Sequence, residues 1–94
     1  MILTYPAKIR HIAEDRAYLV EFPDLPGCLT EGDTLDAAKQ NAKEALTGYL
    51  SSIFERNLKI PDPSALKGRH IYEIEPEPKW QSPYFSKDSG RQEN

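Results

Sequence analysis

The sequence predicts an α+β fold in which an antiparallel three-stranded meander is followed by one long helix and a fourth strand. Three observations support this prediction. Apolar and polar residues alternate near the N-terminus, Pro and Gly are concentrated between positions 22 and 34, and apolar residues then recur at intervals of three and four. The length of 94 residues fits one domain with a modest core.

The first two strands are predicted from period-two alternation. Residues 2–12 place one apolar set on a single face: Leu3, Tyr5, Ala7 and Ile9. Because Pro6 has no N–H to donate to a ladder, it marks an edge position or a bulge. Residues 13–16 form a polar hairpin connection. Residues 17–22 form the return strand, in which Tyr18, Val20 and Phe22 face together.

A dense turn follows, with the sequence Phe22-Pro23-Asp24-Leu25-Pro26-Gly27-Cys28. Each proline fixes φ near about −65° and favours an extended residue before it. Gly27 and Gly32 are suited to positive φ. We expect a third short strand at about residues 28–31.

The period of three and four predicts an amphipathic helix that runs to about Asn57. Asp33 or Thr34 is its expected N-cap, and Asp36 complements the helix dipole in the first turn. Gly48 inside the helix predicts close packing or a slight bend. The expected apolar face consists of Leu35, Ala38, Ala42, Ala45, Leu46, Tyr49, Ile53 and Phe54.

Pro61 and Pro63 prevent the helix from continuing, and a last strand is expected at residues 70–75. We therefore divide the chain into an α+β domain at residues 1–75 and a tail at residues 76–94. The tail has no periodicity, so it is either flexible or docked on a partner. Its aromatic residues are possible anchors: Trp80, Tyr84 and Phe85.

Cysteine content and hydropathy indicate the compartment. A single cysteine, Cys28, excludes an internal disulfide and suits a reducing environment, where it is expected to be a small buried hydrophobe. Apolar runs stay well short of the ~20 residues needed to cross a bilayer. We expect a cytoplasmic protein without membrane contact.

Charge is distributed unevenly along the chain, although the net charge is only −3. Residues 11–38 carry seven acidic side chains and one basic one, whereas residues 39–70 carry six basic and three acidic ones. The acidic half fits a basic protein partner or a solvated face and repels nucleic acid. We therefore expect nucleic acid to be bound only indirectly, if at all.

The sequence predicts no catalytic residues, metal site or cofactor, and hence no enzyme. His11 and His70 lie far apart in sequence, and each has an ordinary structural role in a strand. A meander followed by a helix is also the opening of an RNase H-like fold, whose chemistry requires carboxylates around two divalent ions. The expected first strand contains no acid, so a metal-dependent nuclease is disfavoured.

Four segments together resemble the HicB family, the antitoxins of HicA/HicB toxin-antitoxin pairs. They are FPDLPGC, TEGDT, the helical run from Ala37 to Leu46, and IPDPS, which ends at Ser64. The resemblance implies a partial RNase H-like domain that binds a HicA-like toxin, a small mRNA-cleaving ribonuclease. Many HicB proteins continue into a helix-turn-helix or ribbon-helix-helix segment, which the sequence from Lys79 onward does not show.

From this resemblance and the acidic half we expect an antitoxin that neutralises the toxin by direct binding. The expected toxin-binding residues lie in the turn-rich acidic region: Asp24, Leu25, Glu31 and Asp33. The small core and exposed strand edges predict a homodimer. The alternative is a transcriptional autorepressor that acts with the toxin on its own operator, and a residual nuclease is a more remote possibility.

Overall fold

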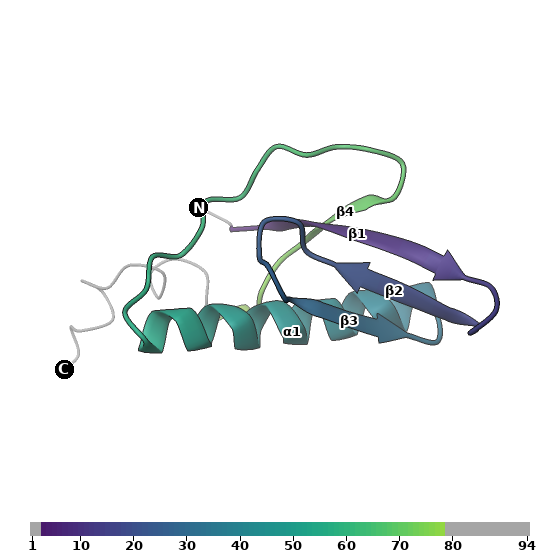
Figure 1. Ribbon diagram of the computed structural model, residues 1–94, viewed down its shortest axis with the longest axis horizontal. Helices are drawn as coiled ribbons and strands as arrows, with labels where there is room; N and C mark the ends of the chain where they lie inside the picture. The colour runs from purple at the N-terminus through teal and green to yellow at the C-terminus, as the bar shows by residue number, and fades with distance from the viewer. Residues whose placement is uncertain (1–2, 79–94) are drawn as a thin grey trace.

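A computed structural model describes residues 3–78 of the chain, as four strands and one helix (Figure 1). The elements are β1 (Tyr5–Ile12), β2 (Ala17–Glu21), β3 (Leu29–Gly32), α1 (Leu35–Glu55) and β4 (Ile71–Ile74). This order confirms the predicted α+β class. The strands form one antiparallel sheet in the order β3-β2-β1-β4, so the last strand lies beside the first. The RNase H-like part of the expectation stays a prediction.

Strand β1 has different neighbours along its length. Its first half pairs with β4 and its second half with β2, and Lys8 pairs with both. The N–H of Ile9 donates to the His70 carbonyl at 2.9 Å. Because backbone N–H groups alternate in direction along a strand, the nitrogen of Pro6 points away from β4, toward the β2 side of β1. Strand β2 does not reach this point, since its pairing with β1 ends at Lys8 and Glu21. Pro6 therefore occupies a local edge, as its missing N–H predicts.

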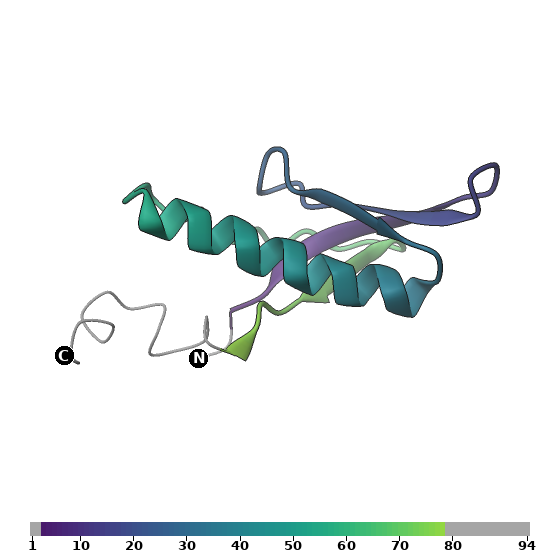
Figure 2. The same cartoon turned by 90° about the horizontal axis from the view of Figure 1, so that it is seen from below.

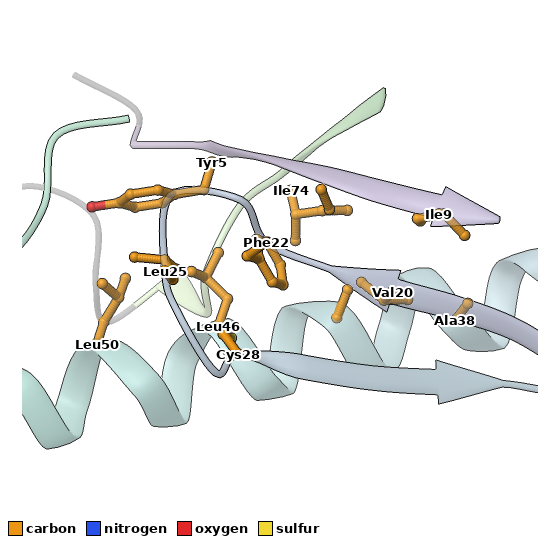
Figure 3. Packing of buried hydrophobic residues seen from close by; sticks show 12 residues of the cluster. Tyr5, Ile9, Val20, Phe22, Leu25, Cys28, Ala38, Leu46, Leu50 and Ile74 are labelled. Atoms are coloured by element: carbon orange, nitrogen blue, oxygen red, sulfur yellow. The ribbon is translucent and has the colours of Figure 1, made fainter. Parts of the chain in front are cut away.

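The core lies between one face of the sheet and α1, which crosses beneath that face (Figures 1 and 2). Alternation in β1 directs Tyr5, Ala7 and Ile9 inward, and each is at most 2% exposed. Figure 3 shows Val20 and Phe22 of the β2 side above Ala38 and Leu46 of the helix. The other buried members of the cluster are Val20, Phe22, Leu25, Cys28, Ala38, Ala42, Leu46, Leu50 and Ile74.

Both ends of α1 have recognisable caps. Thr34, one of the two expected caps, accepts a 3.0 Å hydrogen bond from the Ala37 N–H. At the other end Asn57 adopts a left-handed conformation with φ of 57°. The N–H of Leu58 donates to the Ile53 carbonyl at 3.1 Å, the bond that defines a Schellman motif. The helix thus ends before Pro61 rather than because of it.

Three glycines have three different roles. Gly27 has a φ of +85°, as its place in the turn predicts. Gly48 was expected to pack closely or to mark a bend, and the prediction of close packing is wrong. Gly48 is exposed, and a Cβ there would meet no heavy atom within 4 Å outside its own helix backbone. The close approach occurs at Gly32, where a Cβ would lie 2.7 Å from the Cα of Ala38. Gly32 therefore lets β3 touch the start of the helix.

Candidate functional site

The turn between β2 and β3 is a compact structure held by its own backbone. The N–H of Leu25 donates to the Phe22 carbonyl at 3.0 Å, and the N–H of Cys28 donates to the Leu25 carbonyl at 3.0 Å. The N–H of Phe22 donates to the Cys28 carbonyl at 3.2 Å and closes the loop. These bonds turn the Leu25 side chain inward, so that it is fully buried against the helix (Figure 3).

Two hydrogen bonds fix this turn to distant parts of the chain. The N–H of Ser64 donates to Asp24 Oδ2 at 2.8 Å, and the Tyr49 hydroxyl donates to the Pro26 carbonyl at 2.9 Å. Nearby, the Tyr5 hydroxyl donates to the Pro61 carbonyl at 2.6 Å. The FPDLPGC and IPDPS segments are therefore in direct contact.

The expected toxin-binding residues do not form a single cluster. Asp24 is half-buried in the turn at the start of β3, whereas the exposed Asp33 follows the end of β3 beside the helix N-terminus. Glu31 is exposed within β3, and its carbonyl accepts a 2.8 Å bond from Asn41 Nδ2. Leu25 is 0% exposed, so its side chain offers no surface to a partner in this conformation.

Strand β3 also carries a residue that the sequence reasoning missed. Leu29 is 61% exposed, the highest value among the exposed large hydrophobic residues of the described chain. Its neighbour Cys28 is buried, and successive residues in an extended segment point to opposite faces. The strand expected at about residues 28–31 implies the same alternation, so the sequence carries a signal for an exposed Leu29.

The chain continues against the helix beyond the predicted domain boundary at residue 75. Pro76 is buried, and the N–H of Glu77 donates to Thr47 Oγ1 at 2.8 Å. The division at residue 75 stays a prediction. The proposed tail anchors lie outside the described residues: Trp80, Tyr84 and Phe85.

Two buried side chains have raised pKa values. Burial raises the pKa of the Cys28 thiol to about 11, and its Sγ donates a long 3.8 Å bond to the Ala45 carbonyl. Burial also raises the pKa of Tyr5 to about 12, with smaller contributions from the negative charges of Asp62 and Asp24. Both groups are therefore neutral near pH 7, and Cys28 has the environment of a packing residue.

Over residues 3–78, no three His, Cys, Asp or Glu side chains come together in a group that could hold a metal ion. Within the same residues, the single helix is not apolar enough over its length to span a membrane.

Comparison with known proteins identifies the family. The model of the HicB-like antitoxins of bacterial toxin-antitoxin systems matches residues 5–81. Antitoxin HicB 2 of Photorhabdus laumondii is 38% identical over 72 residues, which cover 77% of this chain and 50% of that protein. The chain thus spans about half the length of several curated relatives that it matches.

Solved structures agree on the fold. The N-terminal domain of the Burkholderia pseudomallei antitoxin HicB matches with a TM-score of 0.60 and 25% identity, covering 68% of this chain and 74% of that one. A chain of a toxin-antitoxin complex from Streptococcus pneumoniae matches with a TM-score of 0.67 and 22% identity, covering 79% and 68%. The family model spans nearly all of the described residues, and these folds agree with it. This chain belongs to the HicB-like antitoxin family of bacterial toxin-antitoxin systems.

Proposed function

We propose that this protein is the antitoxin of a two-protein pair and that it neutralises a HicA-type, mRNA-cleaving ribonuclease by binding it directly in the cytoplasm. The observation that carries the proposal is the family match over residues 5–81, which includes every described helix and strand. A structural relative that occurs within a toxin-antitoxin complex supports a protein partner of the same kind.

The charge of the described surface supports a basic partner. Glu31 and Asp33 are exposed at the end of β3 that meets the helix, and Asp36 is exposed in the first helical turn. A protein that binds RNA presents positive charge, so these carboxylates would complement it and would accelerate the encounter between the two proteins. We propose Glu31 and Asp33 as direct contacts. Asp24 and Leu25 would act by holding the turn in place.

The decisive experiment is co-expression of this chain with the small protein encoded by the neighbouring gene. Expression of the neighbour alone should stop growth and degrade cellular mRNA, and co-expression should restore both growth and intact mRNA. The two proteins should then purify together through a tag on either one. A harmless neighbour, or a toxic one that this chain does not restrain, contradicts the proposal.

Charge reversal tests which surface is involved. The double variant Glu31→Lys and Asp33→Lys should lose neutralisation while keeping the wild-type circular dichroism spectrum, because both side chains are exposed. The matched control is Glu14→Lys and Asp15→Lys, which makes the same change of charge in the β1–β2 hairpin. Equal loss in both variants would show a dependence on total charge instead of a local contact.

A further inference from the structure

The face of the sheet opposite α1 carries an apolar side chain that no described packing explains. Leu29 is 61% exposed, and the half-buried Leu19 on the neighbouring strand lies diagonally across from it. Leu29 lies in a strand of four residues whose backbone is fixed by the ladder with β2. The backbone position of Leu29 is therefore set before binding, which suits an anchor for a partner.

The register of β2 and β3 surrounds Leu29 with a defined set of neighbours. Glu21 lies directly opposite Leu29, and Leu19 lies directly opposite Glu31. Phe22 and Cys28 form a hydrogen-bonded pair, and pair types alternate along an antiparallel ladder. The Glu21–Leu29 and Leu19–Glu31 pairs are therefore of the non-hydrogen-bonded type, in which the Cα atoms are only about 4.5 Å apart. We call these four residues, Leu19, Glu21, Leu29 and Glu31, the Leu29 patch.

The side chains of this patch share one face, with two leucines placed diagonally between two carboxylates. Glu21, Leu29 and Glu31 are exposed, and Leu19 is half-buried. On the other side of this patch, β1 places the exposed Lys8 opposite Glu21 and the exposed Arg10 opposite Leu19, so the acidic part of the face is its β3 side. An apolar group that the partner buries, with polar groups at the rim around it, is the usual anatomy of an interface.

A partner is more readily bound through this face than by adding one of its own strands to the free edge of β3. The backbone groups of Leu29 and Glu31 point away from β2, but the Glu31 carbonyl already accepts the bond from Asn41. The free edge is therefore short, and Asn41 obstructs it on the helix side, as in sheets that resist edge pairing.

We propose that the Leu29 patch is the apolar anchor of the toxin interface: Leu29 enters a hollow on the partner while Glu21 and Glu31 pair with Lys or Arg side chains around it. This inference rests on the proposed function and adds two contact residues to it, Leu29 and Glu21. In this proposal Leu29, and not the buried Leu25, is the leucine that contacts the partner.

The test compares Leu29→Asp with Leu58→Asp, a matched change at another leucine that is 51% exposed and lies outside the sheet. Leu58→Asp should keep the wild-type melting temperature within a few degrees, because the Leu58 side chain is not in the core. Leu29→Asp places a carboxylate directly opposite Glu21, so it should melt several degrees lower and remain folded at the temperature of the binding measurement. Binding to the neighbouring gene's product is measured by titration calorimetry. Leu29→Asp should weaken binding at least about 30-fold, the size of a hot-spot loss, and Leu58→Asp should leave it unchanged.

The outcomes separate this inference from the function on which it rests. If the wild-type chain does not bind the neighbour, the proposed function fails. If the wild-type chain binds and Leu29→Asp binds equally well, the function stands and the Leu29 patch is not the anchor. If Leu29→Asp converts a homodimer into a monomer by light scattering while toxin affinity is unchanged, the patch joins two copies of this chain, and the inference is overturned.

Discussion

The carboxylate of Asp24 accepts a 2.8 Å hydrogen bond from the backbone N–H of Ser64, a residue 40 positions further along the chain. This bond joins the turn after β2 to the segment that leaves the helix. An acidic residue in the middle of a turn therefore has a structural role as well as a charge. Its removal is expected to loosen both segments at once.

Asp24→Ala should lower the free energy of unfolding by about 1–2 kcal/mol, because the Ser64 N–H loses a charged acceptor. Urea denaturation followed by circular dichroism measures this change. Glu14→Ala, in the exposed hairpin, is the control and should change stability by less than about 0.5 kcal/mol. An unchanged urea midpoint for Asp24→Ala would mean that water replaces the carboxylate without cost.

Gly32→Ala should be severely destabilising. The new Cβ would lie 2.7 Å from the Cα of Ala38 and closer still to its nitrogen, and backbone atoms of a capped helix cannot move aside easily. The strain can be relieved only by separating β3 from α1, so we expect a loss of several kcal/mol, as in overpacked cores. The measurement is the melting temperature together with the soluble yield. A fully folded variant with wild-type melting would contradict the predicted contact.

Gly48→Ala should have the opposite effect. Gly48 lies inside α1, is exposed and has open space around its Cα, so alanine adds helix propensity without a clash. We expect an increase in stability of about 0.5–1 kcal/mol, seen as a higher urea midpoint. A decrease would mean that the position contacts a group outside residues 3–78 or a partner.

Cys28 should be unreactive toward thiol reagents in the native protein. Burial leaves the side chain 4% exposed and raises its pKa to about 11, so very little thiolate exists at pH 8. The rate of reaction with a colorimetric disulfide reagent should rise by orders of magnitude in 6 M urea. Rapid labelling without denaturant would show that the turn opens frequently.

Stability should fall as the pH rises from about 9 to 12. In the fold the pKa of Cys28 is raised from 9.0 to about 11 and that of Tyr5 from 10.0 to about 12. The native state therefore keeps protons that the unfolded chain releases, and linkage favours unfolding over this range. Tyr5→Phe removes the Tyr5 contribution, so its stability should decline less between pH 10 and 12. Urea midpoints at four pH values measure the difference, and an identical decline would contradict the assignment.

The sequence predicted most of the fold because alternation and helical periodicity are local signals. Thr34 was one of two expected caps, and the buried face of β1 follows from its period. The expected face of α1 contained Ala42 and Leu46 but missed Leu50, which is fully buried. The position of β4 was not predictable in this way, since nothing local to Ile71 and Ile74 specifies that they pair with β1. The helix was expected to run to about Asn57, and the left-handed Asn57 ends it there, before Pro61 could prevent its continuation.

The candidate site was less predictable for a related reason. Leu25 follows two turn-forming residues, so it was expected at the surface, but the loop hydrogen bonds turn it into the core. Leu29 was not among the expected contacts, and it is exposed because only one face of its strand is covered. Burial of a single side chain depends on which elements meet over it, and this is a tertiary property.

The strand that is synthesised first is the one completed last. Tyr5 pairs with Ile74, so the first half of β1 has no ladder partner until almost the entire described chain has been translated. A nascent chain that ends at the helix can form only the β3-β2-β1 part of the sheet. In that chain β1 is an edge strand, although it is an inner strand of the complete sheet. Completion of the sheet therefore depends on a contact between residues about 70 positions apart, of the kind that forms slowly in folding.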